Sequence, residues 1–479
     1  MTLHVFMIEE TGNRKQETEN STELRNPPIK YYSTNQKAPE VSFGEALLKG
    51  LAPDGGLYMP VSFPKLSAEE LDSFSGKEYY EIAYVVLSKF LGNEIPADAL
   101  LNLCKDAYNF DIPLEKVTDR KYIMRLDQGP TASFKDIAAR MMSRLMQYYL
   151  SINNKFLTIL TATSGDTGSA VASAFFGLEN IKVIILYPEK EVTPMQRKQM
   201  TTLHNNINVI SVNGKFDDCQ NMVKIAFRDP SLSHLPLSSA NSINIGRLLP
   251  QAVYYIYAWS KLALSSDEKA IFSVPSGNFG NLMAGLIASG IGLPVRKFIV
   301  ATNENNEVPE FLKTGKYSRI SPSKNCISSA MNVGHPSNLA RIIALFGGVM
   351  DENGSITIQP DMAKMREDLY GISFSDDVTR NAIADIYRKY SIILEPHGAL
   401  AWLGIKEYSE SIKPNRSEKQ LYISLETAHP AKFPEELINT INREPLLPPS
   451  LSDLKDKKEK ITSIDNDYNK LKDFILNNK

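Results

Sequence analysis

The sequence predicts an α/β protein with parallel sheets, preceded by a mainly helical segment. From residue 156 to residue 300, apolar runs of strand length alternate with helical patterns, which is typical of parallel α/β layers. Residues 31–125 instead read mostly as helices. The chain has 479 residues, of which 43% are hydrophobic, so it can bury a large core and form two or three structural units.

The elements follow in order after a flexible arm over residues 1–30, which is rich in Asn, Glu and Thr and closes with Asn-Pro-Pro. A polar tail over 446–479 follows a proline-rich stretch. Its apolar residues are helically spaced, which leaves open whether it docks or stays mobile. The predicted helices include 67–74, 79–91, 378–389 and 398–408, and the predicted strands are 156–160, 182–186, 207–212, 270–274, 297–301 and 421–425.

Lys135 is the first candidate for chemistry. It lies in the segment Gly129–Asp136, where Ser133 is the predicted cap of a helix over 134–150 with one apolar face. Lys135 therefore falls in the first turn, where the positive end of the helix dipole disfavours an ammonium and favours a nucleophilic amine. Alone, the pattern also fits an ordinary exposed lysine. The motifs downstream favour the nucleophile.

Two later segments have the pattern of backbone anion sites. Thr161–Gly168 is a loop of small hydroxylated residues and glycines between the strand 156–160 and a helix over 169–176. Ser273–Asn281 follows the strand 270–274 and opens a helix over 282–288, and its glycines permit close backbone approach. Each alone fits an ordinary strand-to-helix turn, and neither is a Walker A loop. Together with Lys135 they indicate a phosphorylated ligand and a second, anionic substrate.

The histidines and cysteines give weaker indications of function. His397 and His429 have no partner at metal-ligand spacing, so we interpret both as structural hydrogen-bonding residues and predict no metal site. Cys104, Cys219 and Cys326 are too few and too scattered for a disulfide framework or a zinc site, which favours buried thiols.

The charge balance limits the class of partner. Fifty-three basic and 55 acidic side chains give a net charge of −2, so no basic field attracts nucleic acid or anionic lipid. No apolar stretch approaches the ~20 residues that span a bilayer, and no export segment is visible. We expect a cytoplasmic enzyme with a small-molecule substrate.

The motifs together resemble the pyridoxal-phosphate enzymes of the tryptophan synthase β fold, fold type II, and within them the threonine synthase family. The resemblance covers roughly residues 30–440. It rests on Tyr31–Asn35, Gly50–Tyr58, Gly129–Asp136, Ala240–Arg247 and Glu426–Phe433, together with the two anion loops. Asp127-Gln128 stand where the family commonly has Phe-His, and Ala132-Ser133 where it has Leu-Ala or Tyr-Ala.

The resemblance implies roles for the matching residues. Lys135 would form the Schiff base with pyridoxal 5′-phosphate, and Thr427 would face the pyridine nitrogen. A hydroxyl there favours elimination and replacement over transamination, because it cannot hold a cation as a carboxylate can. Gly277, Asn278, Phe279, Gly280 and Asn281 would hold the cofactor phosphate. Thr163, Ser164, Gly165, Asp166 and Thr167 would receive the substrate's carboxylate, with Asp166 also near the cofactor's 3′-oxygen, and Asn241, Ser242, Asn244 and Arg247 are candidates for the substrate's phosphate.

The implied fold has two parallel-sheet α/β domains. Their expected ranges are 126–238, with the lysine and the substrate loop, and 239–445, with the cofactor loop, after a mainly helical segment over 31–125. The implied reaction converts O-phospho-L-homoserine and water to L-threonine and phosphate, in a monomer or homodimer. Two alternatives stay open at this point: a pyridoxal-phosphate phospho-lyase that stops after elimination, and a non-catalytic relative that binds the cofactor or an amino acid.

Overall fold

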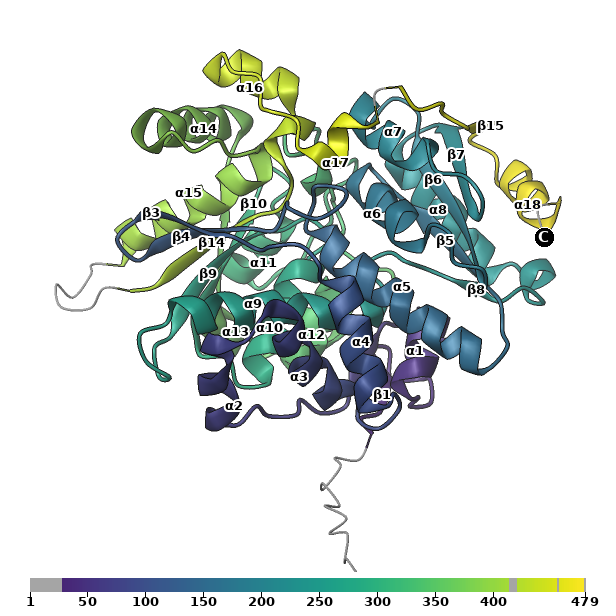
Figure 1. Ribbon diagram of the computed structural model, residues 1–479, viewed down its shortest axis with the longest axis horizontal. Coiled ribbons are helices and arrows are strands. Elements are labelled where there is room, and N and C mark those ends of the chain that lie inside the picture. The colour runs from purple at the N-terminus through teal and green to yellow at the C-terminus, as the bar shows by residue number, and fades with distance from the viewer. Residues whose placement is uncertain (1–27, 413–419, 455, 478–479) are drawn as a thin grey trace, which may run out of the picture.

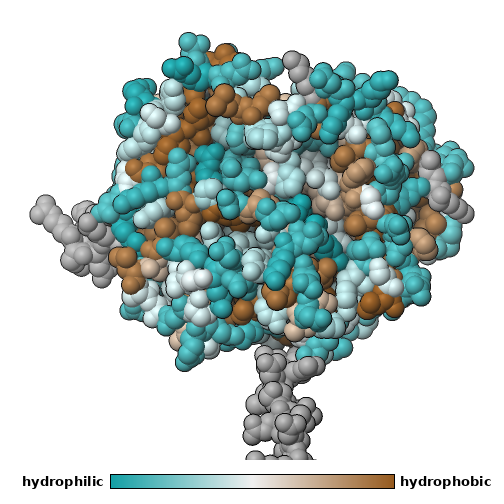
Figure 2. All heavy atoms as spheres, viewed as in Figure 1, coloured by the Kyte–Doolittle hydropathy of each residue, from teal (hydrophilic) through white to brown (hydrophobic). Residues whose placement is uncertain are grey.

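Two parallel sheets, each flanked by helices, form the body of the protein (Figure 1). The computed structural model describes residues 28–412, 420–454 and 456–477. The α/β prediction with parallel sheets is confirmed. Hydrophilic side chains cover most of the face seen in Figure 2, and the apolar residues on it form separate patches. Within the described residues, no helix combines the length and the apolar character needed to cross a membrane.

The larger sheet has six strands in the order β13-β10-β9-β14-β4-β3. All neighbours are parallel except the β3–β4 pair. Helix α15 packs on one face, and the α9–α10 pair covers the other (Figure 1). Both central strands are therefore buried along their whole length, as expected for a sheet covered on two faces. The strands are β3 Leu114–Thr118, β4 Lys121–Arg125, β9 Ala270–Pro275, β10 Val295–Thr302, β13 Leu369–Ser373 and β14 Tyr422–Glu426.

The smaller sheet has five parallel strands in the order β15-β7-β6-β5-β8. Its strands are β5 Leu157–Ala162, β6 Ile181–Pro188, β7 Ile207–Asn213, β8 Leu237–Ser238 and β15 Thr462–Asp465, and its helices are α6 Asp166–Phe175, α7 Pro194–Thr201 and α8 Phe216–Arg228. The long helix α5, Lys135–Ile152, leads from the larger sheet to the smaller one and buries its methionine-rich face.

The amino-terminal segment lies against the body through its helices. Helix α3 packs on α9 and α4 packs on α5. Residues 114–125 differ from the prediction of a helical segment up to 125, because they form β3 and β4 and extend the larger sheet. The segment contains α1 Phe43–Lys49, α2 Ala68–Ser73, α3 Tyr79–Leu91 and α4 Ala97–Ala107, with the strand pair β1 Tyr31–Ser33 and β2 Tyr58–Pro60.

The polar tail docks on the smaller sheet, which settles the question that its sequence left open. Strand β15 pairs with β7, and helix α18, Tyr468–Asn477, buries Leu471 and Ile475 beside α8. The remaining elements are α9 Leu249–Leu262, α10 Gly280–Gly290, α11 Glu307–Thr314, α12 Leu339–Leu345, α13 Met362–Asp368, α14 Asp376–Tyr390, α15 Pro396–Ser411, α16 Pro434–Ile441, α17 Pro449–Ser452, and the pair β11 Val349–Met350 and β12 Ile356–Ile358. The predicted arm over 1–30 lies outside the described residues up to 27.

Candidate active site

A cavity of about 100 Å³, here called the inner cavity, lies where the carboxyl ends of strands from both sheets meet. The loops after β5, β9 and β14 all contribute to its wall, as does the start of α5. Ligands of open parallel sheets bind at this edge, because loops and helix N-termini converge there. Of the predicted residues, it brings together Lys135, Thr163, Ser164, Asp166, Thr167, Asn241, Ser242, Arg247, Gly277, Asn278, Phe279, Gly280, Asn281 and Thr427.

Lys135 lies in the first turn of α5, as the sequence predicted, although the helix begins at Lys135 itself, one residue later than expected. Its side chain is 15% exposed, and its Nζ lies 3.8 Å from Oδ2 of Asp166. Burial lowers the pKa of the Lys135 amine, Asp166 opposes this, and Lys432 and Arg247 lower the pKa further. The predicted cap is wrong: Ser133 forms a strand-like bridge with Ala428, so its hydroxyl does not cap the helix.

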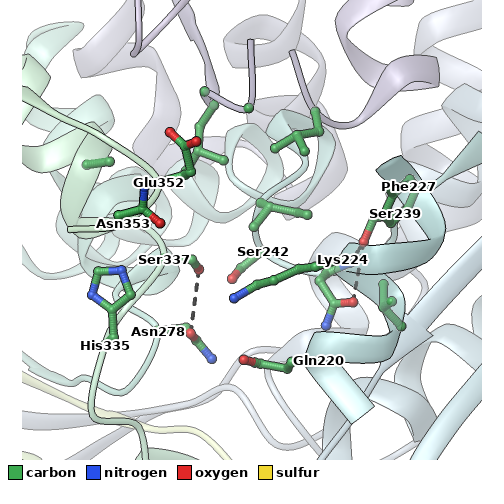
Figure 3. A pocket seen from close by; sticks show the side chains of 18 of the residues that line it. Gln220, Lys224, Phe227, Ser239, Ser242, Asn278, His335, Ser337, Glu352 and Asn353 are labelled. Carbon is green, nitrogen blue, oxygen red and sulfur yellow. Dashed lines mark hydrogen bonds between the residues drawn. The ribbon is translucent and has the colours of Figure 1, made fainter. Parts of the chain in front are cut away.

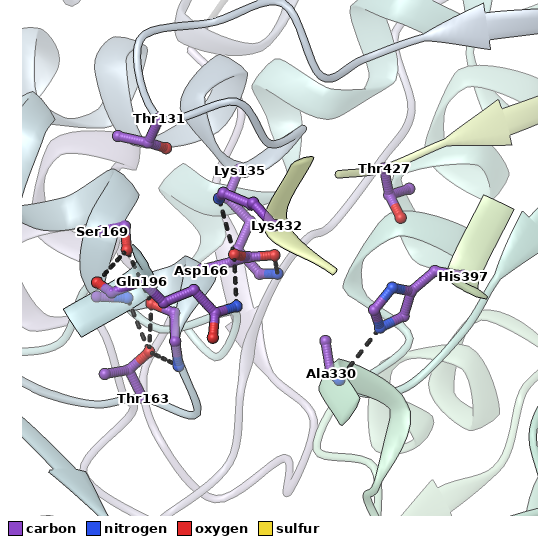
Figure 4. Close-up of polar contacts among 12 residues, drawn as sticks. Thr131, Lys135, Thr163, Asp166, Ser169, Gln196, Ala330, His397, Thr427 and Lys432 are labelled. Atoms are coloured by element: carbon purple, nitrogen blue, oxygen red, sulfur yellow. Dashed lines mark hydrogen bonds and ion pairs between the residues drawn. The ribbon is translucent and has the colours of Figure 1, made fainter. Parts of the chain in front are cut away.

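Lys432 is a functional candidate that the sequence analysis missed. Its side chain is completely buried, and its Nζ donates to Oδ1 of Asp166 at 2.9 Å. Gln196 donates to the same oxygen at 2.9 Å. Figure 4 shows Lys135, Asp166 and Lys432 together on one side of the site. Burial alone would raise the pKa of Asp166, but the two ammonium groups hold it well below its usual range.

The substrate loop is shorter than predicted, because α6 begins at Asp166 and not at residue 169. Thr163 organises this loop: its Oγ1 accepts from the amides of Gly165 at 2.9 Å and Gly168 at 2.8 Å. The Thr163 hydroxyl is therefore occupied by the protein itself. Gly165 caps α6 with no side-chain acceptor, so first-turn amides of the helix remain available to an anion.

The loop after β9 also leads into a helix that lines the inner cavity. Helix α10 begins at Gly280, two residues earlier than predicted, and Phe279 before it adopts φ 60° with no side-chain cap. Nδ2 of Asn281 and Nε of Arg247 are buried, and neither has a hydrogen-bond partner among the residues that the structure describes. Both residues line the inner cavity. Unpaired buried donors are expensive in the absence of an acceptor, so this end of the cavity suits a phosphate group.

We expect Gly277→Ala to weaken cofactor retention strongly. A Cβ at Gly277 would lie 2.6 Å from the carbonyl oxygen of Ala330, so the loop has to move away from the turn that supports it. The sequence analysis expected these glycines to permit close approach of the backbone to a ligand, and the Ala330 carbonyl is a second reason for glycine at this position. Cofactor content after dialysis measures the effect, and Gly76→Ala, with nothing within 4 Å of the new Cβ, is the control.

Thr427 follows β14 and faces the inner cavity opposite the lysines (Figure 4). Its Oγ1 lies 3.5 Å from Oε1 of Glu395, a buried carboxylate that caps α15 through the amides of His397 and Gly398. The ring of His397 is held between Glu395 and the amide of Ala330, which donates to Nε2 at 3.1 Å. Both ring nitrogens are therefore engaged in structural hydrogen bonds. His429 likewise uses Nδ1 as a cap for Ala431.

Two of the predicted substrate residues do not line the inner cavity. The carboxamide of Asn244 is fully used inside the protein, because Nδ2 donates to Leu47 and Ser239 and Oδ1 accepts from Gly246. This corrects its assignment to the substrate's phosphate. Gly165 lies behind Ser164 in the loop and is absent from the wall. Arg247 is buried and donates to the carbonyl of Ala240 at 2.6 Å through Nη1.

Comparison with known proteins agrees with this geometry. Models described as threonine synthase N terminus, pyridoxal-phosphate dependent enzyme, and threonine synthase C-terminal match residues 30–108, 112–420 and 403–475. Threonine synthase of Escherichia coli is 36% identical over 450 residues, which are 94% of this chain and 100% of that protein. The chain belongs to the threonine synthase family. The relative from Buchnera aphidicola (subsp. Acyrthosiphon pisum) is 38% identical over 94% of this chain and 100% of its own length.

Solved threonine synthase structures share the fold. The pyridoxal-phosphate-bound enzyme from Brucella melitensis superposes with a TM-score of 0.86 at 35% identity, covering 94% of this chain and 99% of that chain. The yeast enzyme gives 0.84 at 31% identity, with 93% and 98% covered. Pyridoxal phosphate is accordingly the cofactor of this family member. The residues present fit it, since the amine of Lys135 and the unpaired donors of Asn281 and Arg247 line one cavity.

The departures from the family pattern lie outside the inner cavity. Asp127 is buried and pairs with Arg125 at 3.0 Å, and the side chain of Gln128 donates to Asp127. Ala132 adopts a positive φ of 53° in the turn before α5. Among the described residues, none of Asp127, Gln128, Ala132 and Ser133 lines the wall.

Proposed function

We propose that this threonine synthase family member uses Lys135 to convert O-phospho-L-homoserine and water into L-threonine and phosphate. One observation supports this proposal above all. The buried amine of Lys135 and two separate sets of hydrogen-bond donors that suit anions line the same cavity. One set suits the cofactor phosphate, and the other, at the start of α6, suits an amino-acid carboxylate.

Each residue has a distinct part in the proposed mechanism. The amine of Lys135 would hold the cofactor, and it is placed to move protons at Cα and Cβ of the substrate. The bound cofactor supplies an electron sink for Cα during loss of the γ-phosphate and addition of water at Cβ. Ser164 and the first amides of α6 orient the carboxylate. Thr427 would offer a neutral hydroxyl to the pyridine nitrogen.

The lowered pKa of Lys135 supports the role in proton transfer. Burial and the nearby Lys432 and Arg247 favour the neutral amine, and a neutral amine can accept a proton from Cα. Asp166 limits this effect, because its carboxylate favours the ammonium form. We propose that Lys432 pairs with Asp166 for this reason, so that Asp166 stays charged without claiming the Lys135 proton.

Product analysis tests the function. Incubation with O-phospho-L-homoserine should release inorganic phosphate and L-threonine in equal amounts. Homoserine should be nearly inert, because hydroxide is a poor leaving group and the phosphate contacts are lost. Phosphate accompanied by ammonia and an oxo-acid, with no threonine, would identify a phospho-lyase. No turnover, with retained cofactor binding, would identify a non-catalytic relative.

We also propose that the enzyme works in the cytoplasm as a monomer or homodimer on a small-molecule substrate. The three cysteines are buried free thiols, which suits a reducing compartment. Light scattering of the purified protein measures the oligomeric state.

A further inference from the structure

The carboxy-terminal tail crosses from the larger sheet to the smaller one before its strand β15 pairs with β7. We call residues 449–454 and 456–460 of this tail the strap, and they include α17. Figure 1 shows α17 next to α7, where the helices of the two sheets meet. The strap is therefore in a position to contact elements from both sheets.

One end of the strap packs against three segments that carry site residues. Leu451 and Leu454 are buried in an apolar cluster with Ala132 and Ala431, and Met195 packs against this cluster. Ala132 lies in the turn before α5, Ala431 precedes the buried lysine that pairs with Asp166, and Met195 is in the first turn of α7. The two leucines therefore lie against the segments that carry both lysines of the site.

The other end of the strap holds α7 through Glu459. The carboxylate of Glu459 accepts from Nε of Arg197 at 2.9 Å and from Nη2 at 3.0 Å, and the hydroxyl of Thr201 lies 2.7 Å from Oε2. The amide of Lys460 donates to the carbonyl of Thr201 at 2.8 Å. The hydrogen bond from Arg197 lowers the pKa of Glu459. A two-pronged pair of this kind fixes orientation as well as distance, so α7 is held in one position.

The opposite side of α7 supports the active site. Gln196 packs so closely on Gly165 that a Cβ there would clash with its side chain. Nε2 of Gln196 donates to Oδ1 of Asp166 at 2.9 Å. Nε2 of Gln199 donates to the carbonyl of Thr131 at 3.0 Å, in the turn before α5. Helix α7 thus connects the strap to the substrate loop and to the turn that precedes Lys135.

The position of α7 affects how Asp166 uses its two oxygens. Oδ1 accepts from Lys432 and Gln196, each at 2.9 Å. Oδ2 lies 3.8 Å from Nζ of Lys135, which is beyond hydrogen-bond distance. Without Gln196, the carboxylate would be free to turn toward Lys135 and favour its ammonium form. The charged groups that act on the Lys135 amine are Asp166, Lys432, Arg247 and Glu395.

The strap lies outside the cavities that suit a ligand. A second cavity of about 410 Å³ adjoins the inner cavity, between α8 and the segment 335–337 (Figure 3). No described residue of the strap lines either cavity, and neither Gln196 nor Arg197 does so. We therefore expect the strap to position other residues and not to contact a ligand.

We propose that the strap is a positioning element of the active site, with Glu459 as its principal residue. Glu459 fixes α7, and α7 keeps Gln196 on Oδ1 of Asp166. The carboxylate then stays away from the Lys135 amine, which is left free to attach the cofactor and to move protons. This proposal rests on the role proposed above for Lys135.

Recovery of visible absorbance by the cofactor-free full chain tests the proposal without turnover. Pyridoxal phosphate is added at a series of pH values, and the rate of recovery reports the neutral fraction of the Lys135 amine. Glu459→Gln removes the charge that holds Arg197 at almost constant shape. The pH midpoint of the rate should move upward by about 0.5 unit or more. In the cofactor-loaded protein, kcat should fall roughly 3- to 10-fold while KM stays within about twofold.

Glu436→Gln is the matched control. Glu436 accepts from Nε of Arg380 at 2.7 Å and from Nη2 at 3.3 Å, and the hydroxyl of Thr440 lies 3.2 Å from Oε1. This variant loses a comparable ion pair between α14 and α16, away from the strap, and should leave the midpoint and kcat unchanged. The reversed pair, Glu459→Arg with Arg197→Glu, should restore part of both.

A double variant tests whether the effect passes through Gln196. Gln196→Met removes the donor to Asp166 and should itself move the midpoint upward. Adding Glu459→Gln should then cause little further movement, whereas independent effects would add. Additive movement would overturn the proposal. An unchanged midpoint in Glu459→Gln, with or without a loss of stability, would show a purely structural strap and overturn it too.

Two outcomes separate this proposal from the function on which it rests. If Lys135→Ala keeps the visible absorbance, the role of Lys135 is wrong, whatever the strap does. If Lys135→Ala loses it and the unmodified protein makes threonine, while Glu459→Gln behaves normally, the function stands and the strap proposal is wrong. A moved midpoint in a protein that makes no threonine would support the strap and indicate a different reaction.

Discussion

Lys135→Ala should abolish threonine formation, with a loss of at least about 10⁴-fold, because it removes both the covalent attachment of the cofactor and the group that moves protons. The purified unmodified protein should be yellow, and borohydride should remove the colour by reducing the bond between Lys135 and the cofactor. The alanine variant should lack that visible absorbance. Steady-state phosphate release and an absorbance spectrum measure the two effects.

Lys135→Arg is the matched control for charge. It keeps a cation beside Asp166 but has no amine nucleophile, since a guanidinium is not deprotonated in proteins. It should be as inactive as the alanine variant while folding normally. Full activity in either variant would show that another amine holds the cofactor.

Lys432→Met should have the second largest effect, on stability as well as on activity. It removes the closest cation of a buried carboxylate, since Lys432 lies 2.9 Å from Asp166 and Lys135 lies 3.8 Å away. Breaking a buried ion pair in this way costs about 3–5 kcal/mol. Urea unfolding of the cofactor-free protein measures the change. Lys432→Met combined with Asp166→Asn removes both charges and should recover part of the lost stability.

The pH dependence of this effect has a definite sign. The pKa of Asp166 is lowered in the folded protein, so its ion pairs contribute stability that is present above its unfolded pKa of about 4. That contribution is lost as the pH falls below this value. The unmodified protein and Lys432→Met should therefore converge in stability on the acid side. A constant difference down to the lowest pH at which both fold would contradict the ion-pair explanation.

Lys432 also affects the reactivity of Lys135. Its charge is one of the causes that lower the pKa of the Lys135 amine. Without it, that pKa rises, and a larger fraction of the amine is protonated at neutral pH. The cofactor-free variant should recover its visible absorbance more slowly on addition of pyridoxal phosphate, with the pH midpoint of that rate moved upward.

Local sequence patterns predicted the helices and strands that position the site, but they predicted the first residues of those helices less well. Lys135 lies in the first turn of α5 as expected, because the apolar spacing of that helix is strong and a Gly-Pro turn precedes it. Ser133 fits a capping residue by type, yet its backbone pairs with Ala428 from a segment almost 300 residues away. A tertiary contact therefore overrides the local capping preference of Ser133. Such a contact cannot be predicted from the residues next to Ser133 in the sequence.

The ionic part of the site was the least predictable. Asp166 and Lys432 come from motifs that the sequence analysis had singled out, but their pairing depends on how the two sheets lie against each other. Glu395 contacts Thr427, which lies 32 residues away in the chain, so its neighbours in Glu395-Pro-His-Gly do not predict its place at the site. A lysine inside an otherwise apolar block such as Pro430–Phe433 was a usable signal, since lysines are rarely buried without a partner.

The docking of β15 has a consequence for how molecules of this protein avoid one another. A parallel sheet with an uncovered edge offers a row of free amides and carbonyls to any extended chain that approaches. Here β15 occupies the outer edge of β7, and the opposite edge is the two-residue strand β8. The polar tail thus acts as an internal competitor for a surface that would otherwise favour edge-to-edge association, and the exposed polar side chains of Thr462, Ser463 and Asp465 lie along the new edge.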